Sequence, residues 1–238
     1  GNLVNAGALR FALEREGSIF QTSIDTEVIV HLMARSGMSD FLEALIYALR
    51  QTKGAYSLLV MNRNHLYAVR DPHGFRPLVL GKLDDAWVVT SETCALDIID
   101  AQYVREVQPG ELLEITAGGV KSYFPFERRK QSLCVFEYIY FSRPDSIIFG
   151  NSVHEMRIQL GRMLAKQSGV EADITVPIPD SSICAALGVW PNARPHDNAI
   201  ITTSVPLVSR RAQVNLDIQS VSHRKCGFPG EPCSQRRL

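Results

Sequence analysis

The sequence predicts an α+β domain followed by the start of an α/β domain. Helical periods fill the first fifty residues, and short strand-like segments at hairpin spacing follow them as far as residue 126. After residue 133 the pattern changes to strand, helix and strand in alternation. Helices and strands in separate blocks are typical of α+β domains, whereas alternation is typical of α/β domains. We therefore expect one domain over residues 1–133 and a second over residues 134–188.

The first block contains three expected helices. In each, apolar side chains recur three or four residues apart, and a small polar residue or a glycine stands near the expected ends. Gly17 is the expected stop signal of the first helix. Asp25 is expected to cap the second helix, and Ser39 the third. These helices are predicted over residues 5–16, 26–36 and 40–51.

The second block reads as an antiparallel sheet. Its strand-like segments are short, rich in β-branched and aromatic residues, and separated by turn residues such as the sequence DPHG. One short helix, residues 93–100, interrupts them. The predicted strands are residues 55–62, 65–71, 78–81, 86–92, 103–116 and 120–126.

The segment after residue 133 is expected to begin with a strand over residues 135–141, because VFEYIYF is rich in β-branched and aromatic side chains. A loop is expected next, then a helix over residues 153–167 and a strand over residues 172–178. Residues 179–188 look like a loop that feeds another helix.

Residues 189–238 differ in composition from the rest. They contain seven Lys or Arg, three Asp or Glu and five prolines, without a sustained helical or strand period. We expect a separate tail that is disordered. One hypothesis is that an insertion or deletion near codon 188 has shifted the reading frame, which would explain the sudden loss of periodicity.

The overall composition excludes some classes of function. The chain has 238 residues, with 25 basic and 25 acidic side chains, so no strong field favours nucleic acid or membrane surfaces. Its apolar runs are much shorter than the roughly 18 residues that a membrane span requires. The five cysteines fit reduced thiols better than a disulfide framework. With no secretory signal visible, we expect a cytoplasmic location.

Several motifs then indicate a family. GNLVNAGALR, LYAVRDPHGFRPLVLG, CVFEYIYFSRPDS and VPIPDSS occur in this order within residues 1–188. This part of the chain resembles the amidophosphoribosyltransferases of de novo purine biosynthesis. The resemblance implies a partial N-terminal nucleophile glutaminase domain, an αββα sandwich, followed by the start of a phosphoribosyltransferase domain. Such enzymes release ammonia from glutamine and use it to convert phosphoribosyl pyrophosphate into phosphoribosylamine.

The resemblance also implies roles for two residues of a glutamine site. Gly1 matches the family's oxyanion-hole glycine, whose backbone N–H faces the developing oxyanion. Asp25 matches the acidic residue that pairs with the α-ammonium of glutamine, whereas its spacing alone favours a plain helix cap. The family's nucleophilic cysteine, its second oxyanion donor and its arginine clamp have no counterpart in this chain. We therefore expect the chain itself to lack glutaminase activity.

Two clusters of polar residues are given structural interpretations. Residues Arg70 to Arg76 combine charges with turn residues, and we expect the arginines to tie down a turn rather than to act on a substrate. A direct chemical role for His73 is the less favoured alternative. Ser91 and Glu92 stand where a strand meets a helix and are expected to cap that helix, with a substrate contact as the alternative.

Cys134 has two interpretations. Some members of the family hold an iron–sulfur cluster with four cysteines, one of them at this place before EYIYF, so Cys134 is a candidate ligand in a longer parent protein. In this chain we expect a buried, inert thiol, because the downstream cysteines do not match the family's pattern. A longer parent is also expected to use Mg²⁺ in its phosphoribosyltransferase domain. The downstream cysteines are Cys184, Cys226 and Cys233.

Two alternatives remain open. One is another class II glutamine amidotransferase, against which the EYIYFSRPDS motif argues. The other is a non-catalytic truncated product with a basic tail. The expected partners of the parent are glutamine, phosphoribosyl pyrophosphate and further copies of the same chain, with no nucleic acid and no membrane. Because the pyrophosphate-contacting segment of phosphoribosyltransferases is missing, we expect no phosphoribosyl transfer. We also expect the isolated chain to aggregate, because its sheet edges are open.

Overall fold

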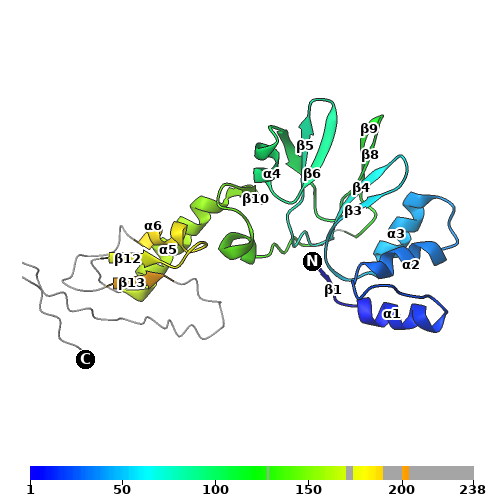
Figure 1. The fold of residues 1–238 in the computed structure, drawn as a ribbon, viewed down its shortest axis with the longest axis horizontal. Coiled ribbons are helices and arrows are strands. Elements are labelled where there is room, and N and C mark those ends of the chain that lie inside the picture. The colour runs from blue at the N-terminus through cyan, green and yellow to red at the C-terminus, as the bar shows by residue number, and fades with distance from the viewer. Residues whose placement is uncertain (128, 170–173, 190–199, 204–238) are drawn as a thin grey trace, which may run out of the picture. The chain divides into compact units, whose positions relative to one another are not determined.

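The computed structural model describes residues 1–127, 129–169, 174–189 and 200–203. The chain divides into two compact units, Gly1–His154 and Glu155–Leu238. Figure 1 shows the first unit as helices beside two antiparallel sheets. Each unit is described by itself below.

Three helices form one layer of the first unit. They pack on one face of a four-stranded sheet through apolar side chains from both layers (Figure 1). Burying these side chains away from water is the main stabilisation of this layer. The helices are α1 (Ala6–Arg15), α2 (Glu27–Arg35) and α3 (Phe41–Gln51). Fully or nearly fully buried members of this core include Leu45, Ala48, Leu49, Val28, Val69 and Leu112.

The caps of these helices differ in part from the sequence prediction. Asp40, not Ser39, caps α3, and its carboxylate accepts a hydrogen bond from the Glu43 N–H at 2.8 Å. Asp40 takes this place because its extended backbone points the side chain at the open amides of the first turn. Gly17 does end the first helical segment as predicted, with φ of +92°.

The four-stranded sheet has the order β3-β4-β8-β9 and is antiparallel throughout. Alternate side chains of its strands face the helices or the second sheet. Leu58 and Val60 pack toward the helices, whereas Ala68 and Leu113 belong to a second apolar cluster between the sheets. The strands are β3 (Ser57–Met61), β4 (Leu66–Arg70), β8 (Leu112–Thr116) and β9 (Gly119–Tyr123).

The second sheet has the order β6-β5-β7, also antiparallel. A short helix, α4, packs against it so closely that a Cβ at Gly81 would lie 2.5 Å from a methyl carbon of Leu96. The sequence prediction of an α+β fold is confirmed by this arrangement. The elements are β5 (Val79–Leu83), β6 (Ala86–Thr90), α4 (Thr93–Ile98) and β7 (Gln102–Glu106).

The strand predicted over residues 135–141 is wrong. This segment forms one turn of π-helix, η1 (Glu137–Phe141), in which the Ser142 N–H bonds to the Glu137 carbonyl at 3.1 Å. The buried Glu137 carboxylate lies 2.7 Å from Nε of Arg76, and this ion pair with a distant turn overrides the local strand preference.

A small hairpin follows within the predicted loop over residues 142–152. Strands β10 (Ile147–Ile148) and β11 (Asn151–Ser152) pair across a two-residue turn. Phe149 and Gly150 at this turn both have positive φ, 49° and 77°, as the tightest hairpin turns require.

The first compact unit ends beyond the boundary predicted after residue 133. The segment around η1 is bonded to the sandwich, since Glu92 accepts hydrogen bonds from the Arg143 N–H and the Ser146 hydroxyl, both at 2.8 Å. The unit therefore runs to His154.

The second unit has the alternation of an α/β domain. Strands β12 and β13 pair in parallel, and α6 lies between them in sequence. β13 lies in the tail for which no strand was expected, so that expectation is wrong for residues 200–203; residues 190–199 and 204–238 lie outside the described residues. The elements are α5 (Val153–Ser168), β12 (Ile174–Pro177), α6 (Ile183–Val189) and β13 (Ile200–Thr203).

Within the part of the chain that the structure describes, no helix is both long and apolar enough to cross a bilayer.

Candidate functional site

Gly1 and Asp25, the two residues predicted for a glutamine site, line the same pocket. The cavity has a volume of about 100 Å³ and lies where two short strands, β1 (Asn2–Leu3) and β2 (Gly54–Ala55), lead into β3. The structure therefore brings together two residues that are 24 positions apart in the sequence. The lining residues are Gly1, Asn2, Leu3, Asp25, Thr26, Ala55, Tyr56, Ser57 and Leu58.

The Asp25 carboxylate is held by the backbone of β1 rather than by a helix. Its Oδ2 accepts a hydrogen bond from the Leu3 N–H at 2.7 Å. The Val4 N–H bonds to Lys53 across the ladder, so by alternation the Leu3 N–H points away from β2 and is free to meet Asp25. The predicted cap of α2 by Asp25 is wrong, because Thr26 occupies the cap position without a side-chain cap bond.

The loop before Asp25 is held by Glu27. The Glu27 carboxylate accepts hydrogen bonds from the Gln21 N–H at 2.8 Å and from the Thr22 N–H at 2.9 Å and hydroxyl at 2.6 Å. These hydrogen bonds lower the pKa of Glu27 to about 2. The bond from the Gln21 amide has the largest effect, and the bond from the Thr22 hydroxyl has the next largest. The ionised carboxylate thus fixes the loop that leads into the pocket.

We expect this loop to loosen in acid. The pKa of Glu27 in the folded state is about 2 and its ordinary value is 4.5, so its contribution is present above pH 4.5 and is lost as the pH falls toward 2. Hydrogen exchange of the Gln21 and Thr22 amides, followed between these pH values and corrected for intrinsic rates, should show falling protection. Glu27→Gln should show low protection at every pH; equal protection in both proteins would contradict this role.

Two residues that the sequence analysis did not single out fix the β1–β2 pair. Gly54 has φ of +140°, and a Cβ there would run into the Asn2 carbonyl. The Asn5 side chain makes two hydrogen bonds across the same junction, each at 2.8 Å. Its amide nitrogen donates to the Gln51 carbonyl, and its amide oxygen accepts from the Lys53 N–H. A lone glycine just before a strand pattern was the available signal for Gly54.

Tyr56 forms the buried side of the pocket and is 3% exposed. Burial raises the pKa of its phenol, and the nearby Asp71 carboxylate raises it further. The phenol therefore stays protonated and neutral, and it offers no negative charge that would compete with Asp25 for a cation.

A second pocket, of about 200 Å³, shares Gly1 and Ser57 with the first. One wall is the Arg76–Glu137 ion pair, with the Arg76 guanidinium 4.5 Å from the centre of the Phe141 ring. The charges of Arg76 and Glu137 are thus engaged with each other. The lining residues are Gly1, Ser57, Arg76, Pro77, Ser91, Glu92, Glu137 and Phe141.

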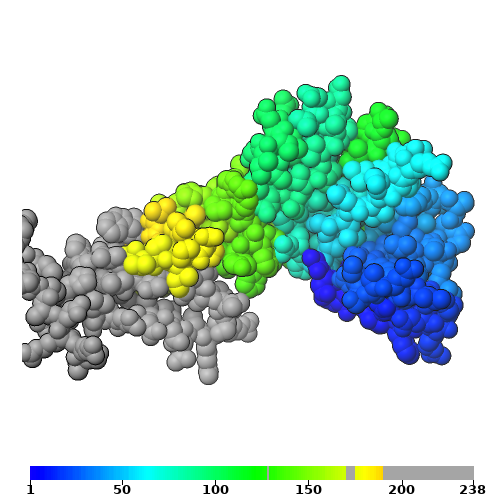
Figure 2. Space-filling view, in the orientation of Figure 1, coloured from blue at the N-terminus to red at the C-terminus, as the bar shows by residue number. Residues whose placement is uncertain are grey.

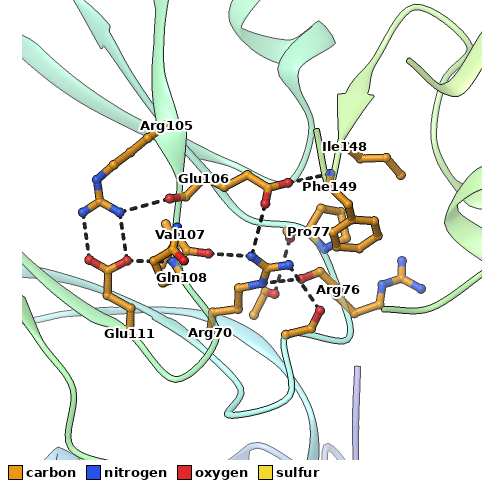
Figure 3. A network of polar contacts seen from close by, with 12 residues as sticks. Arg70, Arg76, Pro77, Arg105, Glu106, Val107, Gln108, Glu111, Ile148 and Phe149 are labelled. Carbon is orange, nitrogen blue, oxygen red and sulfur yellow. Dashed lines mark hydrogen bonds and ion pairs between the residues drawn. The ribbon is translucent and has the colours of Figure 1, made fainter. Parts of the chain in front are cut away.

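The turn over residues 70–76 is held by a buried arginine, and its structural interpretation is confirmed. Figure 3 shows the Arg70 guanidinium surrounded by backbone carbonyls, and it donates to those of Gly74, Arg76 and Val107. The Asp71 carboxylate accepts the N–H groups of His73 and Phe75. His73 lines neither pocket.

Glu92 occupies the cap position of α4 as predicted, but its side chain makes no cap bond. Its carboxylate instead binds the Arg143 N–H and the Ser146 hydroxyl. The predicted side-chain cap is therefore wrong, because the Glu92 carboxylate makes these two hydrogen bonds instead. Ser91 lines the second pocket.

Cys134 lies apart from both pockets. It is half-buried, so the expectation of a fully buried thiol is wrong, and its N–H donates to the Phe75 carbonyl at 3.0 Å. Among the described residues, no group of three or more His, Cys, Asp or Glu could hold a metal ion. The described residues therefore do not form a cluster site; Cys226 and Cys233 lie outside them.

The residues that form this pocket lie in a part of the chain that is similar to known proteins. A family model described as glutamine amidotransferase domain matches residues 1–97. Amidophosphoribosyltransferase of Bacillus subtilis (strain 168) is 52% identical over 188 residues, which are 79% of this chain and 40% of that protein. The matched residues are therefore similar to amidophosphoribosyltransferases. Amidophosphoribosyltransferase 1, chloroplastic, of Arabidopsis thaliana is 51% identical over 189 residues, or 33% of its length.

Solved structures show a similar likeness. One, described as the allosteric regulatory enzyme of purine biosynthesis, has a TM-score of 0.79 and 48% identity, covering 86% of this chain and 44% of that one. The amidotransferase of B. subtilis in complex with ADP and GMP has the same score and identity, covering 84% and 44%. The chain thus spans less than half the length of each of these proteins.

Proposed function

We propose that residues 1–154 supply the glutamine-binding part of a glutamine-dependent amidophosphoribosyltransferase. The observation that carries the proposal is the shared pocket of Gly1 and Asp25, in which the Leu3 N–H fixes the carboxylate. The similarity of the matched residues to amidophosphoribosyltransferases supports the same function. Another class II amidotransferase is less favoured, since the curated relatives matched along residues beyond the glutaminase domain are amidophosphoribosyltransferases.

The chemistry assigns different tasks to the two residues. An ionised Asp25 would bind the α-ammonium of glutamine, because a charge-assisted hydrogen bond suits that group. The Gly1 N–H, just before β1, would donate to the oxygen of the side-chain amide as it becomes an oxyanion. The described lining of the pocket contains no cysteine that could attack the amide. We therefore propose binding without hydrolysis for the 238-residue chain.

Asp25→Asn tests the proposal. The amide oxygen of asparagine can still accept from Leu3, so the pocket keeps its shape while the charge is lost. We expect glutamine to bind roughly 10- to 100-fold more weakly, because a hydrogen bond between charged groups contributes about 1.5–3 kcal/mol. Titrations of the chain followed by NMR at the Leu3, Asp25 and Thr26 amides measure this loss.

The ligand 4-carbamoylbutyrate is glutamine without its α-ammonium group. Comparing the two ligands therefore shows how much of the affinity for glutamine depends on that charge. The unaltered chain should prefer glutamine over this ligand, and Asp25→Asn should lose the preference. Asp85→Asn, in an exposed turn outside the pocket, is the matched control and should bind glutamine normally. Equal affinity for both ligands in the unaltered chain, or no saturable shift at the pocket amides, would overturn the proposal.

The complete reaction is proposed only for a longer protein. There, phosphoribosyl pyrophosphate would be the second substrate, Mg²⁺ would belong to the phosphoribosyltransferase domain, and several copies of the chain would assemble. Phosphoribosyl transfer is not proposed for residues 1–238. The cytoplasm is the proposed compartment, which the free thiols of Cys94 and Cys134 support.

A further inference from the structure

Thr22 lies shortly before Asp25, in the loop that connects α1 with α2, and it is exposed. Its N–H and its hydroxyl nevertheless donate to the Glu27 carboxylate, at 2.9 and 2.6 Å. Its carbonyl accepts from Nη1 of Arg10 at 2.6 Å, and its hydroxyl oxygen also accepts the Ile24 N–H at 3.2 Å. Exposed polar groups commonly bond to water. Protein partners for every polar group of an exposed residue therefore indicate that the loop holds Thr22 in one place.

The two partners that grip Thr22 from outside the loop come from different helices. Arg10 lies on α1 and Glu27 in the first turn of α2, and both helices bury side chains in one apolar core. Arg10 is itself fixed, since its Nε donates to Glu14 at 3.0 Å and its guanidinium lies 4.4 Å from the centre of the Phe20 ring. The stretch that contains α1 and the start of α2, blue in Figure 2, lies at the surface of the first unit. Thr22 is thus held between two helices that share a core.

The hydrogen bonds of Thr22 continue to Asp25 through the backbone of Ile24. The Thr22 hydroxyl binds the Ile24 N–H, and the Ile24 carbonyl accepts from the Glu27 N–H at 3.3 Å. The Asp25 carbonyl accepts from an amide in the first turn of α2 at 3.4 Å. With this backbone fixed, the Asp25 carboxylate meets the Leu3 N–H at 2.7 Å. A group already held in its binding geometry loses less freedom when a ligand binds.

We propose that Thr22 is a positioning residue whose hydroxyl keeps the Asp25 carboxylate in the pocket before a ligand binds. Thr22 lines neither pocket, so it acts through Asp25 and does not touch the ligand. Its hydroxyl carries this role because it donates to Glu27 and accepts from Ile24, and so joins the helix to the loop. The expected effect on glutamine rests on the function proposed above, in which Asp25 binds the α-ammonium.

Thr22→Val tests the role of the hydroxyl. Valine has a similar shape but can make neither hydroxyl bond, whereas the backbone bonds of this position to Arg10 and Glu27 remain possible. We expect glutamine to bind roughly 2- to 10-fold more weakly, which is the effect of one ordinary hydrogen bond. Binding of 4-carbamoylbutyrate should not change, because this ligand has no α-ammonium to meet Asp25. A general distortion of the pocket would instead weaken the binding of both ligands.

Two further variants serve as controls in the same NMR titrations. Thr22→Ser keeps the hydroxyl and should bind glutamine like the unaltered chain. Thr116→Val is the matched control, because the Thr116 hydroxyl also accepts the N–H of the residue two positions later, Gly118, at 3.1 Å. Thr116 lies at the turn between β8 and β9 and lines neither pocket, so Thr116→Val should bind both ligands normally.

The hydrogen bond between Leu3 and Asp25 can also be measured without a ligand. The scalar coupling between the Leu3 amide nitrogen and the Asp25 carboxyl carbon should be present in the unaltered chain, Thr22→Ser and Thr116→Val, and weaker or lost in Thr22→Val. If the unaltered chain does not prefer glutamine, the proposed function fails, and this coupling alone decides whether Thr22 positions Asp25. A coupling that is absent from the unaltered chain or unchanged in Thr22→Val would overturn the inference. A glutamine preference that Asp25→Asn abolishes but Thr22→Val leaves intact would overturn it as well.

Discussion

Arg70→Met is expected to lower the free energy of unfolding of the first unit by about 3–5 kcal/mol, because it removes one partner of a buried charged network. Arg70 is 0% exposed and donates to the Gly74, Arg76 and Val107 carbonyls, with Glu106 3.7 Å from its guanidinium. Methionine fills a similar volume but leaves these acceptors without a donor (Figure 3). Burial lowers the pKa of Arg70, yet an arginine keeps its charge at any ordinary pH.

The loss should spread beyond the turn. Arg70 connects β4 with the β7–β8 connection, and Glu106 in turn accepts the Phe149 N–H at 2.6 Å. Hydrogen exchange of the slowest amides in β4 and β8 measures the change as global unfolding. Arg63→Met, at an exposed turn between β3 and β4, is the matched control and should change stability little. A loss for Arg70→Met no larger than that of the control would show that the carbonyls find other donors.

Elements governed by local patterns were predictable from the sequence. In the helices α1 to α3 and the strands of both sheets, apolar residues recur at the spacing that places them on one face of the element, and that face is buried. The prediction over residues 135–141 was wrong for a non-local reason. VFEYIYF has strand composition, but Glu137 pairs with Arg76, which lies in a turn far away in the sequence. No local pattern contains that contact.

The candidate site was predictable only in part. The family resemblance pointed to Gly1 and Asp25, and the structure places both in one pocket. Spacing alone favoured the wrong role for Asp25, because a helix cap depends on nearby residues, whereas its partner is the Leu3 N–H of a strand 22 positions earlier. Gly54 was missed for a similar reason, since the Asn2 carbonyl that leaves no room for a side chain at Gly54 belongs to β1, which is also distant in the sequence.

Gly161→Ala and Gly188→Ala are each expected to destabilise the second unit by about 1–3 kcal/mol, as overpacking does elsewhere. A Cβ at Gly161 would run into the Ala185 carbonyl of α6, and one at Gly188 into the Ile158 carbonyl of α5. The backbones of the two helices are therefore in contact, and a backbone carbonyl cannot avoid an added methyl group by changing rotamer as a side chain can. Alanine is the better helix former by about 0.8–1 kcal/mol, so the expected net loss means that the collision outweighs propensity.

Gly7→Ala separates these two effects. Gly7 lies inside α1, and nothing within 4 Å would meet an added Cβ, so this change should raise stability by about 0.5–1 kcal/mol. Hydrogen exchange of the α5 and α6 amides should then show lower protection in Gly161→Ala and Gly188→Ala and no loss in Gly7→Ala. If either helix-contact variant gained stability as Gly7→Ala does, α5 and α6 would not pack backbone to backbone in solution. A loss confined to α5 and α6, with the first unit unchanged, would show that this contact stabilises the second unit alone.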